Sequence, residues 1–224
     1  MRRRGLITGI AIAVVVTAAA AVVVGVLANR TPAPTAHTSV PPASSPTSSP
    51  VASDAPPTGC LGGTSRDAAM VLAAQKAAPH NSTGAVEVAA AFTRWSHQYP
   101  YPSAEDAKKV EDAVMSASVP ESSRDLVGFF AGNPNASGGT VPDNTPYYFS
   151  TVDGVWRVDS YSDAKTVVSI GAGVVINGAL NPSAEVGSTF TFVWEDGRWR
   201  LSNEAAPEST DTLFASGQPF TGGC

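Results

Sequence analysis

The spacing of apolar residues divides the chain into three stretches. Residues 6–28 form an uncharged apolar run whose only polar side chains are Thr8 and Thr17. Residues 31–58 consist mainly of Pro, Ser, Thr and Ala and have no periodic apolar face. From residue 59 onward, apolar positions recur first at helical spacing and then in the alternating pattern of strands. The pattern predicts a hydrophobic segment, a linker and one folded domain at residues 59–224.

The first run is long enough to cross a membrane, because a transmembrane helix needs about 20 apolar residues. Three arginines at positions 2–4 precede the run and Arg30 follows it, and positive charge stays on the cytoplasmic side. We therefore expect residues 1–5 in the cytoplasm, a single transmembrane helix at residues 6–28 and an extracytoplasmic domain. A cleaved signal peptide is the alternative, although its apolar core would be only about 7–15 residues long.

The linker at residues 31–58 is expected to be a disordered stalk. Proline at this density favours extended chain, and the segment has too few apolar side chains to offset the entropy of folding. Its Ser and Thr residues leave O-glycosylation open. The stalk would hold the domain away from the bilayer.

Helices are predicted in the first half of the domain. One of them opens at Ser103 and carries Asp106 three residues later, which is close to a capping box, and its apolar residues then recur at helical spacing. The predicted helices cover residues 67–78, 84–98, 103–118 and 122–131.

Strands are predicted in the second half. The alternating segments are residues 147–152, 155–161, 166–180, 188–194 and 198–202. Asp153-Gly154 and Asp196-Gly197 are typical of hairpin turns, and Asn181-Pro182 is expected to end the third strand. The expected fold is α+β, with N-terminal helices packed on a curved, cone-like antiparallel sheet.

One short pattern occurs twice, as Asp-Gly-x-Trp-Arg-aliphatic at residues 153–158 and 196–201. Two copies are too few for a repeat architecture. We interpret them as the same hairpin used twice, with an inward Trp and an outward Arg.

The two cysteines of the chain, Cys60 and Cys224, bracket the folded domain. In an oxidising compartment such a pair predicts a disulfide, which would tie the two ends of the domain together. A metal site is not expected, because two cysteines without nearby histidines fall short of four ligands.

The distribution of charge along the chain argues against two classes of binding partner. All 19 acidic residues lie beyond residue 30, so the exported part is acidic and poorly suited to a nucleic-acid backbone or an anionic membrane surface. The chain has no nucleophile elbow, zinc-protease motif or phosphate-binding loop. No catalytic residue and no cofactor is therefore predicted.

Aromatic residues gather at two places, near the end of the second predicted helix and at the start of the first predicted strand. They are candidates for a pocket under the sheet or for a partner surface, whereas the alternative is ordinary core packing. The six residues are Trp95, Tyr99, Tyr101, Tyr147, Tyr148 and Phe149.

The overall plan resembles a known group of proteins. The matching segments are residues 84–86, 89–91, 164–168 and 193–201. Together with the anchor and stalk, they resemble actinobacterial membrane proteins of conjugative and integrative elements. They are also similar to the extracytoplasmic domains of type IV secretion assembly proteins, which have the nuclear-transport-factor-two-like fold. The resemblance implies a non-enzymatic scaffold with protein partners in the cell envelope.

Two other functions stay open. The domain could bind a lipid or another small apolar ligand between its helices and sheet. It could also be an isomerase or dehydratase, which requires an acidic, His or Tyr side chain facing a pocket with a perturbed pKa. His97, Asp159 and Tyr161 are the residues to examine for that chemistry.

Overall fold

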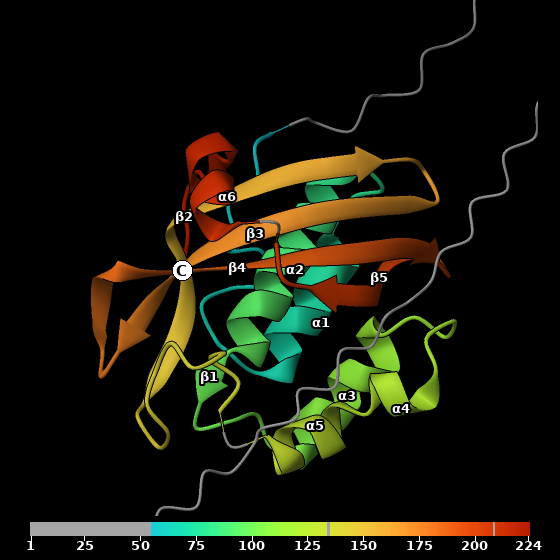
Figure 1. Ribbon diagram of the computed structural model, residues 1–224. Coiled ribbons are helices and arrows are strands. Elements are labelled where there is room, and N and C mark those ends of the chain that lie inside the picture. The colour runs from blue at the N-terminus through green and yellow to red at the C-terminus, as the bar shows by residue number, and fades with distance from the viewer. Residues whose placement is uncertain (1–54, 134, 208) are drawn as a thin grey trace, which may run out of the picture. The chain divides into compact units, whose positions relative to one another are not determined.

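The computed structural model describes residues 55–133, 135–207 and 209–224. These residues form an α+β domain in which helices pack on a curled antiparallel sheet (Figure 1). The predicted transmembrane helix at residues 6–28 and most of the predicted linker lie outside this range. Within the described range, no helix combines the length and the apolar character needed to cross a membrane.

Three helices form the first layer of the domain. They are α1 (Ala68–Ala77), α2 (Ser82–Ser96) and α3 (Ala104–Val114). The side chains of Asp67, Asn81 and Ser103 each accept a hydrogen bond from the backbone of the first helical turn. Such caps satisfy N–H groups that have no partner inside the helix. The predicted positions of these helices are confirmed, although the third ends at Val114 and not near residue 118.

Two short helices stand where one was predicted at residues 122–131. They are α4 (Glu121–Arg124) and α5 (Leu126–Gly132). The chain breaks between them at Asp125, because its carboxylate accepts a hydrogen bond from the Gly128 N–H at 2.7 Å and so starts a new helix. A further helix, α6 (Thr210–Ser216), was not predicted.

Four long strands follow one another in the sheet in chain order, all antiparallel. They are β2 (Tyr147–Tyr161), β3 (Lys165–Ile176), β4 (Ala179–Glu195) and β5 (Arg198–Ala205). Two very short strands, β1 (Gln98–Tyr99) and β6 (Gln218–Pro219), both pair with β2. The sheet curls around α2, while α6 covers its opposite face (Figure 1).

The hairpin predicted at Asp153-Gly154 is wrong. Strand β2 continues through these residues, and its register with β3 shifts between Ser150 and Val155. The C-terminal segment occupies the resulting bulge: the Thr151 N–H donates to the Cys224 carbonyl at 3.0 Å. Asp153 has a φ of 56°, a conformation that serves a bulge as well as a turn. Tertiary contacts therefore decide between the two.

The second predicted turn is confirmed, and a third was missed. Asp196 and Gly197 both have positive φ and connect β4 to β5 as a tight hairpin. Asn177 and Gly178, with φ of 51° and 82°, form the same kind of turn between β3 and β4. The predicted strand 166–180 is thus two strands, and β4 begins well before residue 188. The expectation that the Asp-Gly-x-Trp-Arg pattern forms one hairpin twice is also wrong.

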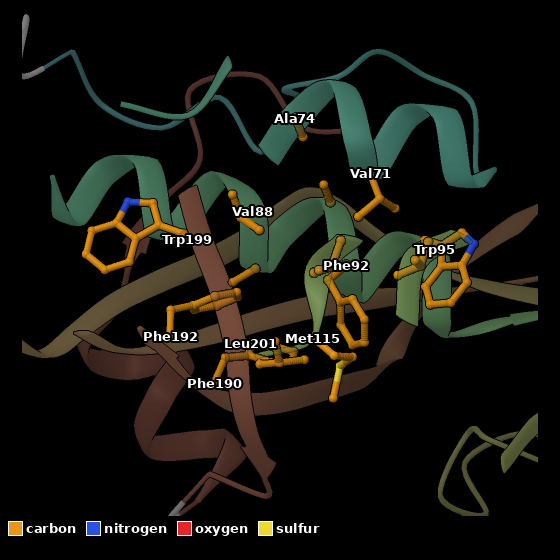
Figure 2. Close-up of a cluster of buried hydrophobic side chains, with 14 of the residues drawn as sticks. Val71, Ala74, Val88, Phe92, Trp95, Met115, Phe190, Phe192, Trp199 and Leu201 are labelled. Atoms are coloured by element: carbon orange, nitrogen blue, oxygen red, sulfur yellow. The ribbon is translucent and has the colours of Figure 1, made fainter. Parts of the chain in front are cut away.

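The main core lies between α1, α2 and the concave face of the sheet (Figure 2). Phe92 and Trp95 project from α2 and are at most 2% exposed. Phe92 meets Phe190 of β4 edge to face, with ring centroids 6.0 Å apart. Three further strand residues of the same cluster, Phe192, Trp199 and Leu201, are equally buried. Burying one large side chain of this kind stabilises a domain by roughly 2–3 kcal/mol, so this layer holds α2 against the sheet.

The predicted bridge between Cys60 and Cys224 is present, with their Cα atoms 5.5 Å apart, which is an ordinary disulfide spacing. The adjoining chain is also bonded into the domain. Glu87, buried on α2, accepts hydrogen bonds from the Gly59 N–H and the Thr58 hydroxyl at 3.1 and 3.0 Å. Residues 57 and 58, assigned to the linker from sequence, therefore pack as part of the folded domain.

Candidate functional site

A cavity of about 670 Å³ lies between the short helices and the sheet. One side is formed by α4 and α5, another by the end of α2, and the third by β4 and β5. It exists because β5 is shorter than β4: the last pair of the two strands is Thr189 with Ala205. Gly187 and Ser188 on β4 therefore have no neighbour on β5, and both line the cavity. The volume is within the range of small-molecule sites.

The inner wall of the cavity is apolar. Phe92 from α2 and Leu201 from β5 are each 2% exposed, and they lie beside Met115 in Figure 2. Phe129 and Phe130 of α5 add an edge-to-face pair with centroids 5.2 Å apart. Phe129 is 48% exposed, so the aromatic wall runs from the core to the solvent-facing rim.

Among the described residues, His97 is the one histidine that lines the cavity, and the end of α2 positions it. Its imidazole stacks on the Phe149 ring with centroids 4.6 Å apart, and its carbonyl accepts a hydrogen bond from the Phe149 N–H. The side chain is 17% exposed. Burial lowers the pKa of His97 below its ordinary value, and this effect outweighs the opposite influence of Glu204. The ring is therefore neutral at pH 7.

The hydrogen bonds around His97 assign its tautomer. The Ser96 hydroxyl donates its proton to the Phe92 carbonyl at 2.8 Å. The same oxygen lies 2.8 Å from His97 Nδ1, and having used its proton it can only accept there. Nδ1 therefore carries the hydrogen, and Nε2 presents a lone pair.

The polar residue opposite His97 is Glu204 on β5. Its Oε1 lies 4.0 Å from His97 Nε2, and its side chain is 34% exposed. Asp125 supplies a second, exposed carboxylate at the rim. No Lys or Arg is found among the described residues that line the cavity, so its charged groups are all acidic.

The six aromatic residues predicted as a pocket or partner surface lie elsewhere. Trp95 is fully buried in the main core, and Tyr147 and Phe149 belong to a second buried cluster. Tyr148 is covered by the guanidinium of Arg66, 3.9 Å from the ring centre.

The remaining two of the six, Tyr99 and Tyr101, are half-buried and meet edge to face. Tyr101 also lines a smaller hollow of about 200 Å³ between α3 and α5. None of the six lines the larger cavity, and their role as a binding surface stays a prediction.

The residues named for isomerase chemistry are not brought together. Of the three, only His97 lines the cavity. Asp159 and Tyr161 are exposed on β2, where Asp159 forms an ion pair with Arg157 and the Tyr161 hydroxyl bonds Asp163. Among the described residues, no group of His, Cys, Asp or Glu is arranged to hold a metal ion.

Sequence reasoning missed most of the cavity. Phe129, Phe130 and Glu204 carry no motif, and they lie on two elements far apart in the sequence, α5 and β5. The usable signal was the pair of adjacent phenylalanines, Phe129 and Phe130, inside the helix predicted at residues 122–131.

Comparison with known proteins gives no relative: no family model, curated protein or solved structure matches this chain.

Proposed function

We propose that this domain is a binding domain, presented on the extracytoplasmic side of a membrane, that takes a small and largely apolar molecule into the cavity. The observation that carries the proposal is the cavity itself, with its apolar inner wall and a few polar groups on one side. This combination is typical of small-molecule sites. The acidic domain, the disulfide and the apolar segment at residues 6–28 support the location.

The residues that the sequence suggested for isomerase chemistry are not gathered in the cavity. His97 faces the cavity while Asp159 and Tyr161 lie exposed on β2. Glu204 is the carboxylate opposite His97, and the binding proposal assigns both groups to contacts with the ligand. The scaffold role in a conjugation or type IV secretion-like apparatus stays a prediction from the resemblance.

The test uses phenethyl alcohol, phenethylamine and phenylacetate, which have similar size but different charge. Each is titrated by ligand-observed NMR into the full-length chain in lipid nanodiscs, with empty nanodiscs as the blank. Ligands this small bind a good site with a Kd on the order of 1 mM. We expect saturable binding of at least one of the three.

A blocking variant ties the binding to the cavity. Ser188 lines the cavity and pairs with the buried Ile170 of β3, so its side chain lies on the concave face of the sheet. Ser188→Phe therefore places a ring in the hollow. The matched control is Ala73→Phe, on the exposed face of α1 and outside the cavity. Ser188→Phe should abolish binding and Ala73→Phe should leave it unchanged. If Ser188→Phe weakens the binding of none of the probes, the proposed function is wrong.

A further inference from the structure

We propose that the ligand of this cavity is an apolar amine, bound as its ammonium ion between His97 and Glu204. This inference rests on the proposed function and adds the chemical class of the ligand. Three features of the cavity carry it: two converging hydrogen-bond acceptors, an excess of negative charge and an aromatic wall.

The two acceptors face one another without a proton between them. The Ser96 hydroxyl holds His97 in the tautomer with hydrogen on Nδ1, so Nε2 offers a lone pair. The Glu204 carboxylate offers another at Oε1, 4.0 Å away. That distance is too long for a hydrogen bond. Neither atom donates to the other, because Nε2 carries no hydrogen in this tautomer and a carboxylate oxygen only accepts.

An ammonium nitrogen satisfies both acceptors at once. It carries three donor hydrogens and no acceptor. Two hydrogen bonds of about 2.9 Å that converge on one nitrogen require acceptors roughly 4–5 Å apart, and Nε2 and Oε1 are 4.0 Å apart. A hydroxyl has a single hydrogen and can donate to only one of the two. A carboxylate has none and would face two acceptors.

The surrounding charge favours the same class of ligand. Glu204 and Asp125 are both acidic, and no described lining residue is basic, so a fatty acid or another anion would be repelled. The aromatic rings of Phe92, Phe129 and Phe130 line the same cavity, and aromatic rings attract cations. They also cover the apolar part of the molecule, which explains why the amine should be apolar and not a simple polyamine.

The experiment compares the three probes on the full-length chain in nanodiscs. We expect phenethylamine to bind about 5-fold more tightly than phenethyl alcohol, because Glu204 is partly exposed and its ion pair is weakened by solvent. Phenylacetate should bind most weakly. Added salt should narrow the difference between amine and alcohol, since it screens only the charged probe.

Substitutions then assign the effect to the two acceptors. Glu204→Gln removes the charge at nearly constant size. It should weaken the binding of phenethylamine about 5-fold and change the binding of phenethyl alcohol less than about 2-fold. Glu185→Gln, an exposed carboxylate of β4 outside the cavity, is the matched control. His97→Asn keeps a donor toward Ser96 but loses the Nε2 acceptor. It should likewise weaken the binding of phenethylamine alone among the three probes.

The outcomes separate this inference from the proposed function. If phenethyl alcohol or phenylacetate binds as tightly as phenethylamine, or if Glu204→Gln leaves amine binding unchanged, the assignment of an amine is wrong. Binding that Ser188→Phe still blocks would then keep the cavity as a binding site. If Ser188→Phe affects the binding of none of the probes, both conclusions are wrong.

Discussion

Removing the disulfide gives the largest expected change in stability. The bridge joins Cys60 to Cys224 across a sequence separation of 164 residues, nearly the whole folded domain. The double variant Cys60→Ser/Cys224→Ser opens the loop. The native contacts of the chain end remain, because the Cys224 carbonyl accepts hydrogen bonds from the Thr151 N–H and the Ser150 hydroxyl. The effect should therefore fall mainly on the unfolded state.

The magnitude follows from the loop length. On the chain-entropy relation, closing a loop of this size lowers the entropy of the unfolded chain enough to stabilise the native state by about 5 kcal/mol at room temperature. Natural domains are stable by only about 5–15 kcal/mol. The variant should thus lose a third or more of its free energy of unfolding.

The assay is urea unfolding of the full-length chain in nanodiscs, followed by tryptophan fluorescence, with and without reductant. With a slope of about 2 kcal/mol/M, the midpoint should fall by about 2.5 M. Reductant should lower the urea midpoint of the wild type to that of the double variant and leave the midpoint of the variant unchanged. This comparison distinguishes the effect of losing the cross-link from the effect of the two substitutions. A midpoint that moves by less than about 0.5 M would refute the reasoning. Two free thiols in protein isolated from intact cells would also contradict export to an oxidising compartment.

Three further predictions follow from single sites. Gly171→Ala would place a Cβ 2.8 Å from the Phe214 ring and should destabilise the domain by about 1–3 kcal/mol in thermal unfolding, whereas Gly132→Ala, which meets nothing within 4 Å, should not. Glu87→Gln replaces a buried acceptor of backbone N–H groups. The substitution should lower the free energy of unfolding by about 1–3 kcal/mol and speed hydrogen exchange at residues 59–61. Unchanged exchange at these residues would contradict this role of Glu87. Burial lowers the pKa of His97, so the folded form resists protonation. Stability should be retained at pH 7 and decline as the pH falls below about 6.5, the ordinary pKa of histidine in the unfolded chain, as thermal unfolding at each pH would show. Phenethylamine binding should persist to lower pH and decline only through the lowered pKa of the folded protein, which an NMR titration of the ring locates. Binding that strengthens in acid would contradict this prediction.

The sequence correctly predicted the helices and turns whose ends depend on contacts between residues close together in the chain. Asp67 and Ser103 cap α1 and α3 through side-chain bonds to their own first turns. Asp196-Gly197 forms its hairpin because both residues adopt positive φ at low cost. The Cys60–Cys224 pair was also predictable, since two cysteines allow one pairing. In each case the partner atoms are close in sequence or unique in the chain.

Only the tertiary structure decided the rest. Asp153-Gly154 became a bulge because the C-terminal residues pair with β2 there, a partner some seventy residues away that no local pattern reveals. The cavity likewise assembles His97, Phe129 and Glu204 from three separate elements, and the tautomer of His97 depends on how α2 ends. Sequence determined the α+β class and its capped helices because those depend on short-range geometry. The site depends on how a curled sheet brings distant segments together, and that is a property of packing.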